Sequence, residues 1–132
     1  MKKIVVLVFV LIITLCGCGA NNADIGNEEY NSEIYTDAEI QSAINVATKY
    51  FNKNFKGCKL TKITYAGDDK TRDFKEWKER HNADEVIVLL SSFEVGASGG
   101  DGSLNPNSTY DNWSWILVRN KNGAWKHVDH GY

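Results

Sequence analysis

The residues best suited to acid–base chemistry lie together near the C-terminus, where His127, Asp129 and His130 follow one another closely. A histidine next to a carboxylate can serve as a general base with the group that orients it. Alternate side chains of a strand share a face, so we expect His127 and Asp129 on one face and His130 on the other. The segment offers no nucleophile, and His81 is far away in sequence. The alternatives to a general base are a solvated strand end and, less favoured, a two-histidine metal site.

A second candidate site is the segment 96–112, which is much longer than an ordinary connection of about 4 to 6 residues. It is rich in glycine and serine, and oxygen-bearing side chains occupy alternate positions: Asp101, Ser103, Asn105 and Asn107. The first half of a calcium loop is built in this way. Pro106 replaces the turn glycine, however, and Asn112 stands where such a loop has glutamate. We therefore expect no metal or cofactor and interpret Gly96 to Asn112 as a binding or gating loop or as a plain surface loop.

Aromatic side chains gather on one face of a strand predicted from Trp113 to Arg119, where Trp113, Trp115 and Leu117 alternate. An aromatic wall with polar groups at its margin suits a small ligand or a peptide. The side chains expected at this surface are Trp113, Trp115, Arg119, His130 and Tyr65. The alternative is that both tryptophans belong to the core. A shift of register by one residue would exchange the two faces.

The N-terminus has the layout of a bacterial lipoprotein signal. Lys2 and Lys3 precede an apolar run from Ile4 to Leu15, which is shorter than the roughly 20 residues of a spanning helix. The sequence Leu15-Cys16-Gly17-Cys18 resembles the lipobox of bacterial lipoproteins, which implies cleavage after residue 17 and a lipid on Cys18. We therefore predict a signal peptide over 1–17 and a lipid anchor on the extracytoplasmic face of the cell membrane. An uncleaved anchor or an ordinary secretory signal are the alternatives.

Charge separates a tether from a domain. Residues 18–35 contain four acidic side chains and no basic one: Asp24, Glu28, Glu29 and Glu33. This composition predicts a disordered acidic tether. Residues 36–132 carry equal numbers of acidic and basic side chains, and their length suits one domain. Nucleic acid is excluded as a partner because the basic stripe that it requires is absent from the sequence.

Cysteine usage restricts the chemistry further. With Cys16 removed and Cys18 lipidated, Cys58 has no partner for an internal disulfide. The sequence has no four cysteine or histidine ligands at the spacing of a zinc site. Cys58 is interpreted as a small buried hydrophobic residue, with a nucleophile or an intermolecular bridge as alternatives.

Local patterns predict one helix followed by strands. Thr36 and Glu39 form a capping box, and apolar residues then recur at helical spacing before Gly57: Ile40, Ala43, Ile44, Ala47, Tyr50, Phe51 and Phe55. Strands are predicted over 58–66, 85–95, 113–119 and 124–129, a short second helix over 71–81, and a hairpin at Asn122-Gly123. This order indicates an α+β domain in which an antiparallel four-stranded curved sheet packs on one long N-terminal helix.

The segments 89–93, 99–110, 115–119 and 125–132 together resemble a family of uncharacterised clostridial-type lipoproteins. That family is similar to the cystatin-like, nuclear-transport-factor-two-like superfamily, whose fold is a curved sheet that grips a helix. The resemblance covers residues 36–132 and implies this fold. It implies no catalytic residues, because the superfamily includes enzymes, binding proteins and scaffolds alike.

These features favour a membrane-anchored, extracytoplasmic binding or accessory module for a small molecule, a peptide or an envelope protein. Such a module requires a cavity beside the tryptophans. One alternative is an enzyme that uses the His127 and Asp129 region, which requires both side chains at one cavity. The other is a surface interaction or inhibitory protein, which requires an exposed apolar patch.

Overall fold

A computed structural model describes residues 29–132, so the predicted signal peptide 1–17 and the predicted lipid site Cys18 lie outside the described residues. Along the chain it has seven elements: α1 (Asp37–Asn54), β1 (Cys58–Tyr65), α2 (Asp68–Asp73), α3 (Glu76–Arg80), β2 (Glu85–Val95), β3 (Thr109–Arg119) and β4 (Lys126–Gly131). None of the helices in the described part is both long and apolar enough to cross a membrane.

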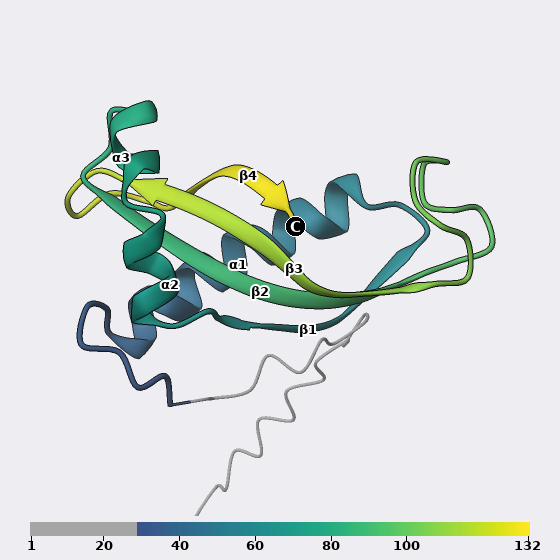
Figure 1. Cartoon of the computed structure of the whole chain (residues 1–132), viewed down its shortest axis with the longest axis horizontal. Helices are drawn as coiled ribbons and strands as arrows, with labels where there is room; N and C mark the ends of the chain where they lie inside the picture. Colours follow the sequence, from purple (N-terminus) through teal and green to yellow (C-terminus); the bar gives the residue numbers. More distant parts are fainter. Residues whose placement is uncertain (1–28) are drawn as a thin grey trace, which may run out of the picture.

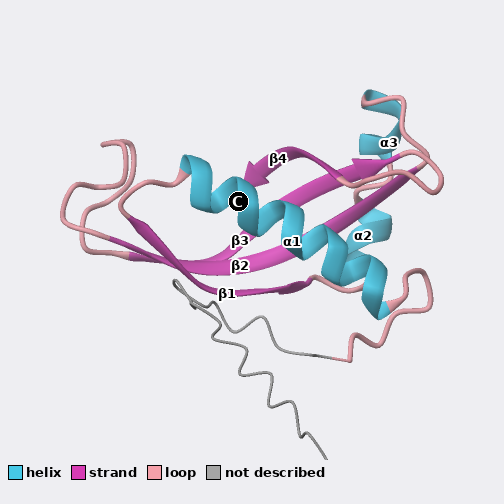
Figure 2. Cartoon of the chain, turned by 180° about the vertical axis from the view of Figure 1, so that it is seen from behind, coloured by secondary structure: helices cyan, strands magenta, loops and turns pink. Residues whose placement is uncertain are grey.

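The four strands form one antiparallel sheet in the order β1-β2-β3-β4. The sheet is curved, and α1 packs against one of its faces while α2 and α3 lie on the other (Figures 1 and 2). The predicted α+β class and the antiparallel four-stranded curved sheet are therefore confirmed. Since neighbouring strands are also neighbours in sequence, the sheet is a simple meander.

Local sequence signals place α1. The side chain of Thr36 accepts from the amide of Glu39 at 3.2 Å, and the Glu39 carboxylate accepts from the Thr36 amide at 2.8 Å, so the predicted capping box is confirmed. Five of the seven residues of the predicted apolar stripe are buried: Ile40, Ala43, Ile44, Ala47 and Phe51. The other two, Tyr50 and Phe55, are half-buried. The stripe packs on inward side chains of the sheet: Ile87, Leu89, Phe93, Trp115 and Leu117.

Several predicted boundaries change, among them the start of the last strand, which is Lys126 and not residue 124. The single helix predicted over 71–81 is instead two short helices, α2 and α3. The strand β3 begins at Thr109, because Thr109 and Tyr110 pair with Glu94 and Phe93, so the long connection is reduced to residues 96–108. The last strand runs to Gly131, two residues beyond its predicted end.

The segment 29–35, predicted as part of the tether, packs on the domain. Tyr35 is buried, and its hydroxyl donates to the carbonyl of Val86 at 2.8 Å. The Ser32 hydroxyl and the Glu33 amide both donate to the carboxylate of Asp68, at 2.6 and 2.8 Å. The acidic composition of this segment predicted disorder, although the segment contains Tyr35, an aromatic residue that belongs to the core. The packed part of the chain therefore extends to the N-terminal side of Thr36.

Candidate ligand-binding site

A bulge in β4 decides which C-terminal side chains face α1. Ile116 pairs with Asp129, but Leu117 pairs with His127, so Val128 is the extra residue opposite β3. His127 and His130 therefore lie on the same face, and Asp129 is exposed on the other. The expectation that His127 and Asp129 share a face is wrong, because plain alternation cannot show a bulge.

The two histidines contact each other directly. Nε2 of His127 and Nδ1 of His130 are 3.1 Å apart, so one ring donates a hydrogen bond and the other accepts it. The Tyr50 ring packs on His127 with 4.0 Å between ring centroids. Burial, reinforced for His127 by the neighbouring His130, lowers the pKa of both histidines below the ordinary 6.5. The pair is therefore neutral at neutral pH.

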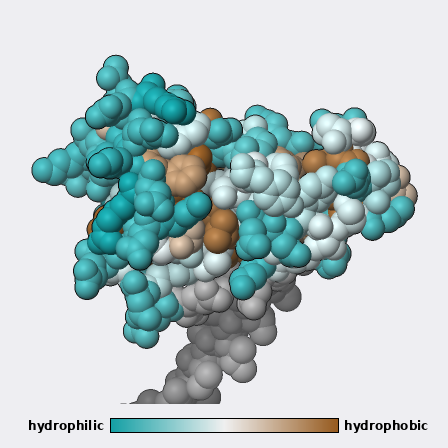
Figure 3. All heavy atoms as spheres, viewed as in Figure 1, coloured by the Kyte–Doolittle hydropathy of each residue, from teal (hydrophilic) through white to brown (hydrophobic). Residues whose placement is uncertain are grey.

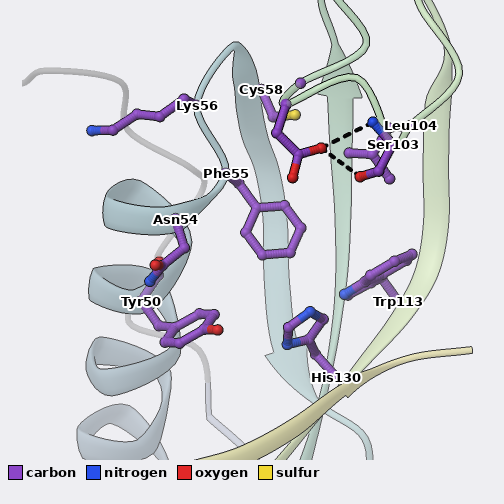
Figure 4. A pocket seen from close by; sticks show the side chains of 11 residues that line it. Tyr50, Asn54, Phe55, Lys56, Cys58, Ser103, Leu104, Trp113 and His130 are labelled. Carbon is purple, nitrogen blue, oxygen red and sulfur yellow. Dashed lines mark hydrogen bonds between the residues drawn. The ribbon is translucent and has the colours of Figure 1, made fainter.

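A half-open cavity of about 260 Å³ lies beside His130, where the end of α1 meets the 96–108 loop and the end of β4. Figure 4 shows its side chains arranged around the ring of Phe55. It is lined by Tyr50, Asn54, Phe55, Lys56, Cys58, Gly100, Asp101, Ser103, Leu104, Trp113 and His130. Its size suits a small ligand or one side chain of a partner, at the lower limit of about 300 Å³ for ligand pockets.

Two nitrogens of the cavity wall have no hydrogen-bond partner. The indole Nε1 of Trp113 is buried and unpaired, and in Figure 4 it points toward Phe55 and His130. The second ring nitrogen of His130, Nε2, also bonds to nothing within residues 29–132. For the buried indole N–H of Trp113 the lack of a partner is costly and is rarely left so without a reason. Nε2 of His130 is not among the buried unpaired atoms of residues 29–132, so it is open to solvent in the cavity.

The 96–108 loop closes one side of the cavity and is held by its own hydrogen bonds. The Asp101 carboxylate accepts from both the amide and the hydroxyl of Ser103, and the Asn105 amide donates to the Tyr110 hydroxyl at 3.2 Å. Gly99 has a φ of +69°, and a Cβ there would lie 2.5 Å from the Leu104 carbonyl oxygen. The close approach of Gly99 to Leu104 fixes the loop in this shape.

The loop has no sign of a calcium site. Asp101 uses its carboxylate to cap the turn at Ser103. Nowhere in residues 29–132 do three or more histidine, cysteine or acidic side chains come close enough to hold a metal ion.

Cys58 lines the cavity as a free, partly buried thiol. Burial, with a smaller effect from the charge of Asp101, raises its pKa. The raised pKa keeps the group a thiol, while a nucleophile needs the thiolate. We therefore assign Cys58 no role as a nucleophile and describe it as part of the cavity wall.

Of the five predicted surface residues, only Trp113 and His130 line the cavity. Trp115 is fully buried, and its indole donates to the Ser91 hydroxyl at 2.8 Å. Tyr65 donates its hydroxyl to Asp68 at 2.7 Å. Trp115 therefore offers no surface to a ligand, and Tyr65, which is half-buried, lies outside the cavity lining.

Arg119, the third residue that the prediction misplaced, lies at the opposite end of the sheet. Its guanidinium pairs with Glu39 at 2.6 Å and with Glu85, and it stacks over the Trp125 ring at 4.3 Å. Although burial alone would lower its pKa, the two carboxylates hold it above the ordinary value. Arg119 is a packed ion-pair centre with no access to the cavity lining.

A second hollow of about 580 Å³ adjoins the cavity and shares Tyr50 and Asn54 with it. Its remaining lining residues are Val46, Lys49, Lys53, Trp125, Lys126 and His127. We call the two hollows together the α1–β4 groove. The helical spacing of Tyr50 and Phe55 had marked them as core, so their part in the groove was missed.

Comparison of the chain with protein-family models, with curated proteins and with solved structures found no match. The residues that form the groove are therefore the basis for the function proposed below.

Proposed function

We propose that this chain is a membrane-anchored, extracytoplasmic lipoprotein whose domain binds a small ligand in the α1–β4 groove. The observation that carries the proposal is the unpaired Nε1 of Trp113 and the unpaired Nε2 of His130 in the wall of one cavity. A small ligand that reached them would give the buried Trp113 indole N–H the acceptor that it lacks and would bond to the open Nε2 of His130. The surrounding rings of Tyr50 and Phe55 supply apolar contact.

The position of the groove is consistent with a lipid anchor on Cys18. The chain enters the described part at the N-terminal end of α1, where the amide of Tyr30 donates to Asp37 at 3.1 Å. The cavity lies at the other end of α1, beside Asn54, and the helix has 18 residues and so measures about 27 Å. A domain tethered in this way would present its groove away from the membrane.

The proposed fold family follows the resemblance to clostridial-type lipoproteins. A helix laid across a curved four-stranded antiparallel sheet is the arrangement expected of a cystatin-like, nuclear-transport-factor-two-like domain. We take α1 as the long N-terminal helix of such a domain. In this proposal the groove is the space between helix and sheet that remains open at one end.

The two alternatives find less support. An enzyme that uses His127 with Asp129 needs both side chains at one cavity, and the bulge separates them. An interaction protein needs an apolar patch, whereas the face in Figure 3 has only small separate hydrophobic areas. Among the large hydrophobic residues of 29–132, only Ile34 and Tyr132 are exposed.

A nuclear magnetic resonance titration of the full chain tests the proposal. The indole N–H signals of the four tryptophans are followed while pools of small aromatic and aliphatic compounds are added. We expect a saturable shift of the Trp113 signal, with Trp77 on α3 as an internal reference. If no pool shifts Trp113 in a saturable manner, the proposed function is wrong.

A further inference from the structure

The α1–β4 groove is bordered by cations that have no ionic partners. Lys49, Lys53 and Lys126 line the second hollow, and Lys56 lines the cavity. All four are exposed, and the ion pairs of residues 29–132 involve arginines only. Within residues 29–132, therefore, no ion pair neutralises the charge that they place around the groove.

Acidic groups are scarce in the same place. The lining of the second hollow contains no carboxylate, and that of the cavity contains only Asp101. One oxygen of Asp101 already accepts two hydrogen bonds from Ser103. A lysine in the last turn of a helix stabilises the helix dipole, which accounts for Lys53. It does not account for Lys126, which comes from β4.

The centre of the groove is made of rings. Tyr50 separates the two hollows and lines both of them. Its ring packs on His127, and its centroid lies 5.7 Å from that of His130. Trp113 and Phe55 continue this surface into the cavity. A planar group laid against these rings would have a lysine within reach in either hollow.

Given the small-ligand function proposed above, we propose that the ligand of the α1–β4 groove is a ring-bearing anion, and that its binding is coupled to proton uptake by His127 and His130. The ring packs beside Tyr50, and the anionic group faces the lysines. The hydrogen bond between the two histidines needs one N–H and one lone pair. One added proton leaves that bond intact and gives the groove a further positive charge.

The charges that surround the histidine pair decide how it responds. α1 contributes Lys49, Lys53 and the Tyr50 hydroxyl, the turn after α1 contributes Lys56, β1 contributes Cys58, and the 96–108 loop contributes Asp101. β4 with the residue after it contributes Lys126, Asp129 and Tyr132. Four lysines disfavour a charged imidazole, whereas Asp129 and Asp101 favour it. An anion bound in the groove would offset the lysines, and protonation of the pair would then become easier.

Four small compounds distinguish the contribution of the anionic group to binding from that of the aromatic ring. Benzenesulfonate carries a ring and an anion that stays ionised throughout the range used, methanesulfonate has the anion alone, benzyl alcohol the neutral ring, and benzylammonium a ring with a cation. Each is titrated into the full chain by calorimetry and by the Trp113 indole signal. We expect benzenesulfonate to bind at least about tenfold more tightly than the other three, since it alone combines a ring for the aromatic surface with a negative charge that the lysines attract.

The pH dependence tests the role of the histidines. Between about pH 7.5 and about pH 5.5, we expect the affinity for benzenesulfonate to rise about threefold to tenfold, with proton uptake on binding visible in buffers of different ionisation enthalpy. The double variant His127→Gln with His130→Gln should abolish this rise. A rise that survives in the double variant would show that other groups take up the proton, and the coupling would be wrong.

A matched pair of lysine variants locates the anion. Lys53→Gln combined with Lys126→Gln should weaken benzenesulfonate by about threefold to tenfold. The control Lys75→Gln, an exposed lysine next to α3 on the other side of the sheet, should leave it unchanged. Equal effects of both would mean that the anion responds to net charge alone, which overturns the inference.

The probes also distinguish the inference from the function on which it rests. If benzyl alcohol or benzylammonium shifts Trp113 as strongly as benzenesulfonate does, the ligand is not an anion, and the groove remains a binding site. If none of the probes and none of the compound pools binds, both proposals are wrong.

Discussion

The two ends of α1 carry similar aromatic clusters that differ in their polar groups. At the N-terminal end, Tyr35 and Trp125 surround Arg119, and every polar group of the cluster has a partner: Trp125 donates to the carbonyl of Glu39 at 3.1 Å, and the guanidinium holds two carboxylates. At the C-terminal end, Trp113 and His130 each keep an unpaired nitrogen beside a cavity.

The contrast shows where the fold gains stability and where it leaves chemistry open. Buried polar groups with partners contribute to stability, and those without partners reduce it. We therefore assign the ion-pair cluster around Arg119 to structure and the cavity beside Trp113 and His130 to binding, with Trp125 also in the lining of the second hollow of the groove. The predictions below are ordered by the size of the effect expected if this division is correct.

Loss of the guanidinium should have the largest effect. Arg119→Met leaves the carboxylates of Glu39 and Glu85 next to each other without a cation, and we expect a loss of about 3 kcal/mol in the free energy of unfolding. The measurement is a urea unfolding curve. Arg119→Lys keeps the charge and loses the planar stack on Trp125, so its free energy of unfolding should lie between those of the wild type and of Arg119→Met. A loss below about 0.5 kcal/mol for the methionine variant would contradict the structural role.

A second prediction concerns Ser91, which lies between the two ends. Its hydroxyl accepts from the Trp115 indole at 2.8 Å and donates to the Trp113 carbonyl at 3.2 Å. Ser91→Ala leaves the buried Trp115 indole N–H without an acceptor and removes a donor to the Trp113 carbonyl, so we expect a loss of about 2 kcal/mol by urea unfolding. Ser114→Ala is the control, because within the described residues the Ser114 side chain makes no hydrogen bond. Equal losses of the free energy of unfolding in Ser91→Ala and Ser114→Ala would contradict the structural role of the Ser91 hydroxyl.

The third prediction is that the two ends lose stability in different pH ranges. Burial holds the pKa of His127 and of His130 below 6.5, so the stability is complete above pH 6.5 and declines as the pH falls below it. Hydrogen bonds from the Thr36 amide and then from Arg119 hold the pKa of Glu39 below 4.5, so its contribution is lost only below pH 4.5. Melting temperatures across the pH range should show two declines.

A variant separates these two declines. Replacement of His127 and His130 by phenylalanine removes the groups that titrate near pH 6.5 and leaves Glu39 untouched. The upper decline should disappear while the acid decline remains. If the upper decline survives the double replacement, the pair does not cause it.

The smallest effect is expected at Trp113. Trp113→Phe removes a donor that has no acceptor, so the free energy of unfolding should change by less than about 1 kcal/mol. Ligand binding in the groove should nevertheless weaken, because the ring forms the cavity wall. Trp115→Phe should show the reverse: a larger loss of stability, since its indole is hydrogen-bonded and fully buried. A large loss of stability in Trp113→Phe would show that Trp113 has a structural role and would contradict this prediction.

The sequence predicted those parts of the fold that depend on neighbours in the chain. The Thr36 and Glu39 capping box, the buried stripe of α1 and the order of the strands rest on local spacing, and the structure has all three. The alternation of Trp115 and Ile116 between two faces is likewise local, and the two side chains lie in different clusters.

The site depended on contacts between distant residues, which spacing does not contain. Arg119 was expected at the ligand surface. Its pairing with Glu39 was missed because Glu39 lies 80 positions earlier in the chain, and local spacing does not reveal so distant a contact. His130 was expected to face away from His127 because the bulge is visible only when β4 is paired with β3. Trp113 and His130 were both named from the sequence and both line the cavity, although β3 begins earlier and β4 ends later than predicted.

The bulge at Val128 also bears on how the chain tolerates insertions and deletions. The strand β4 carries one residue more than β3 needs, so deletion of Val128 returns the pairing to plain alternation while His127 and His130 keep Leu117 and Trp115 as partners. Next to Ile116, by contrast, β3 has no spare residue. A deletion there would exchange the faces of Trp115 and its neighbours and bring a polar surface against α1. The placement of the two histidines on one face therefore does not require Val128 itself.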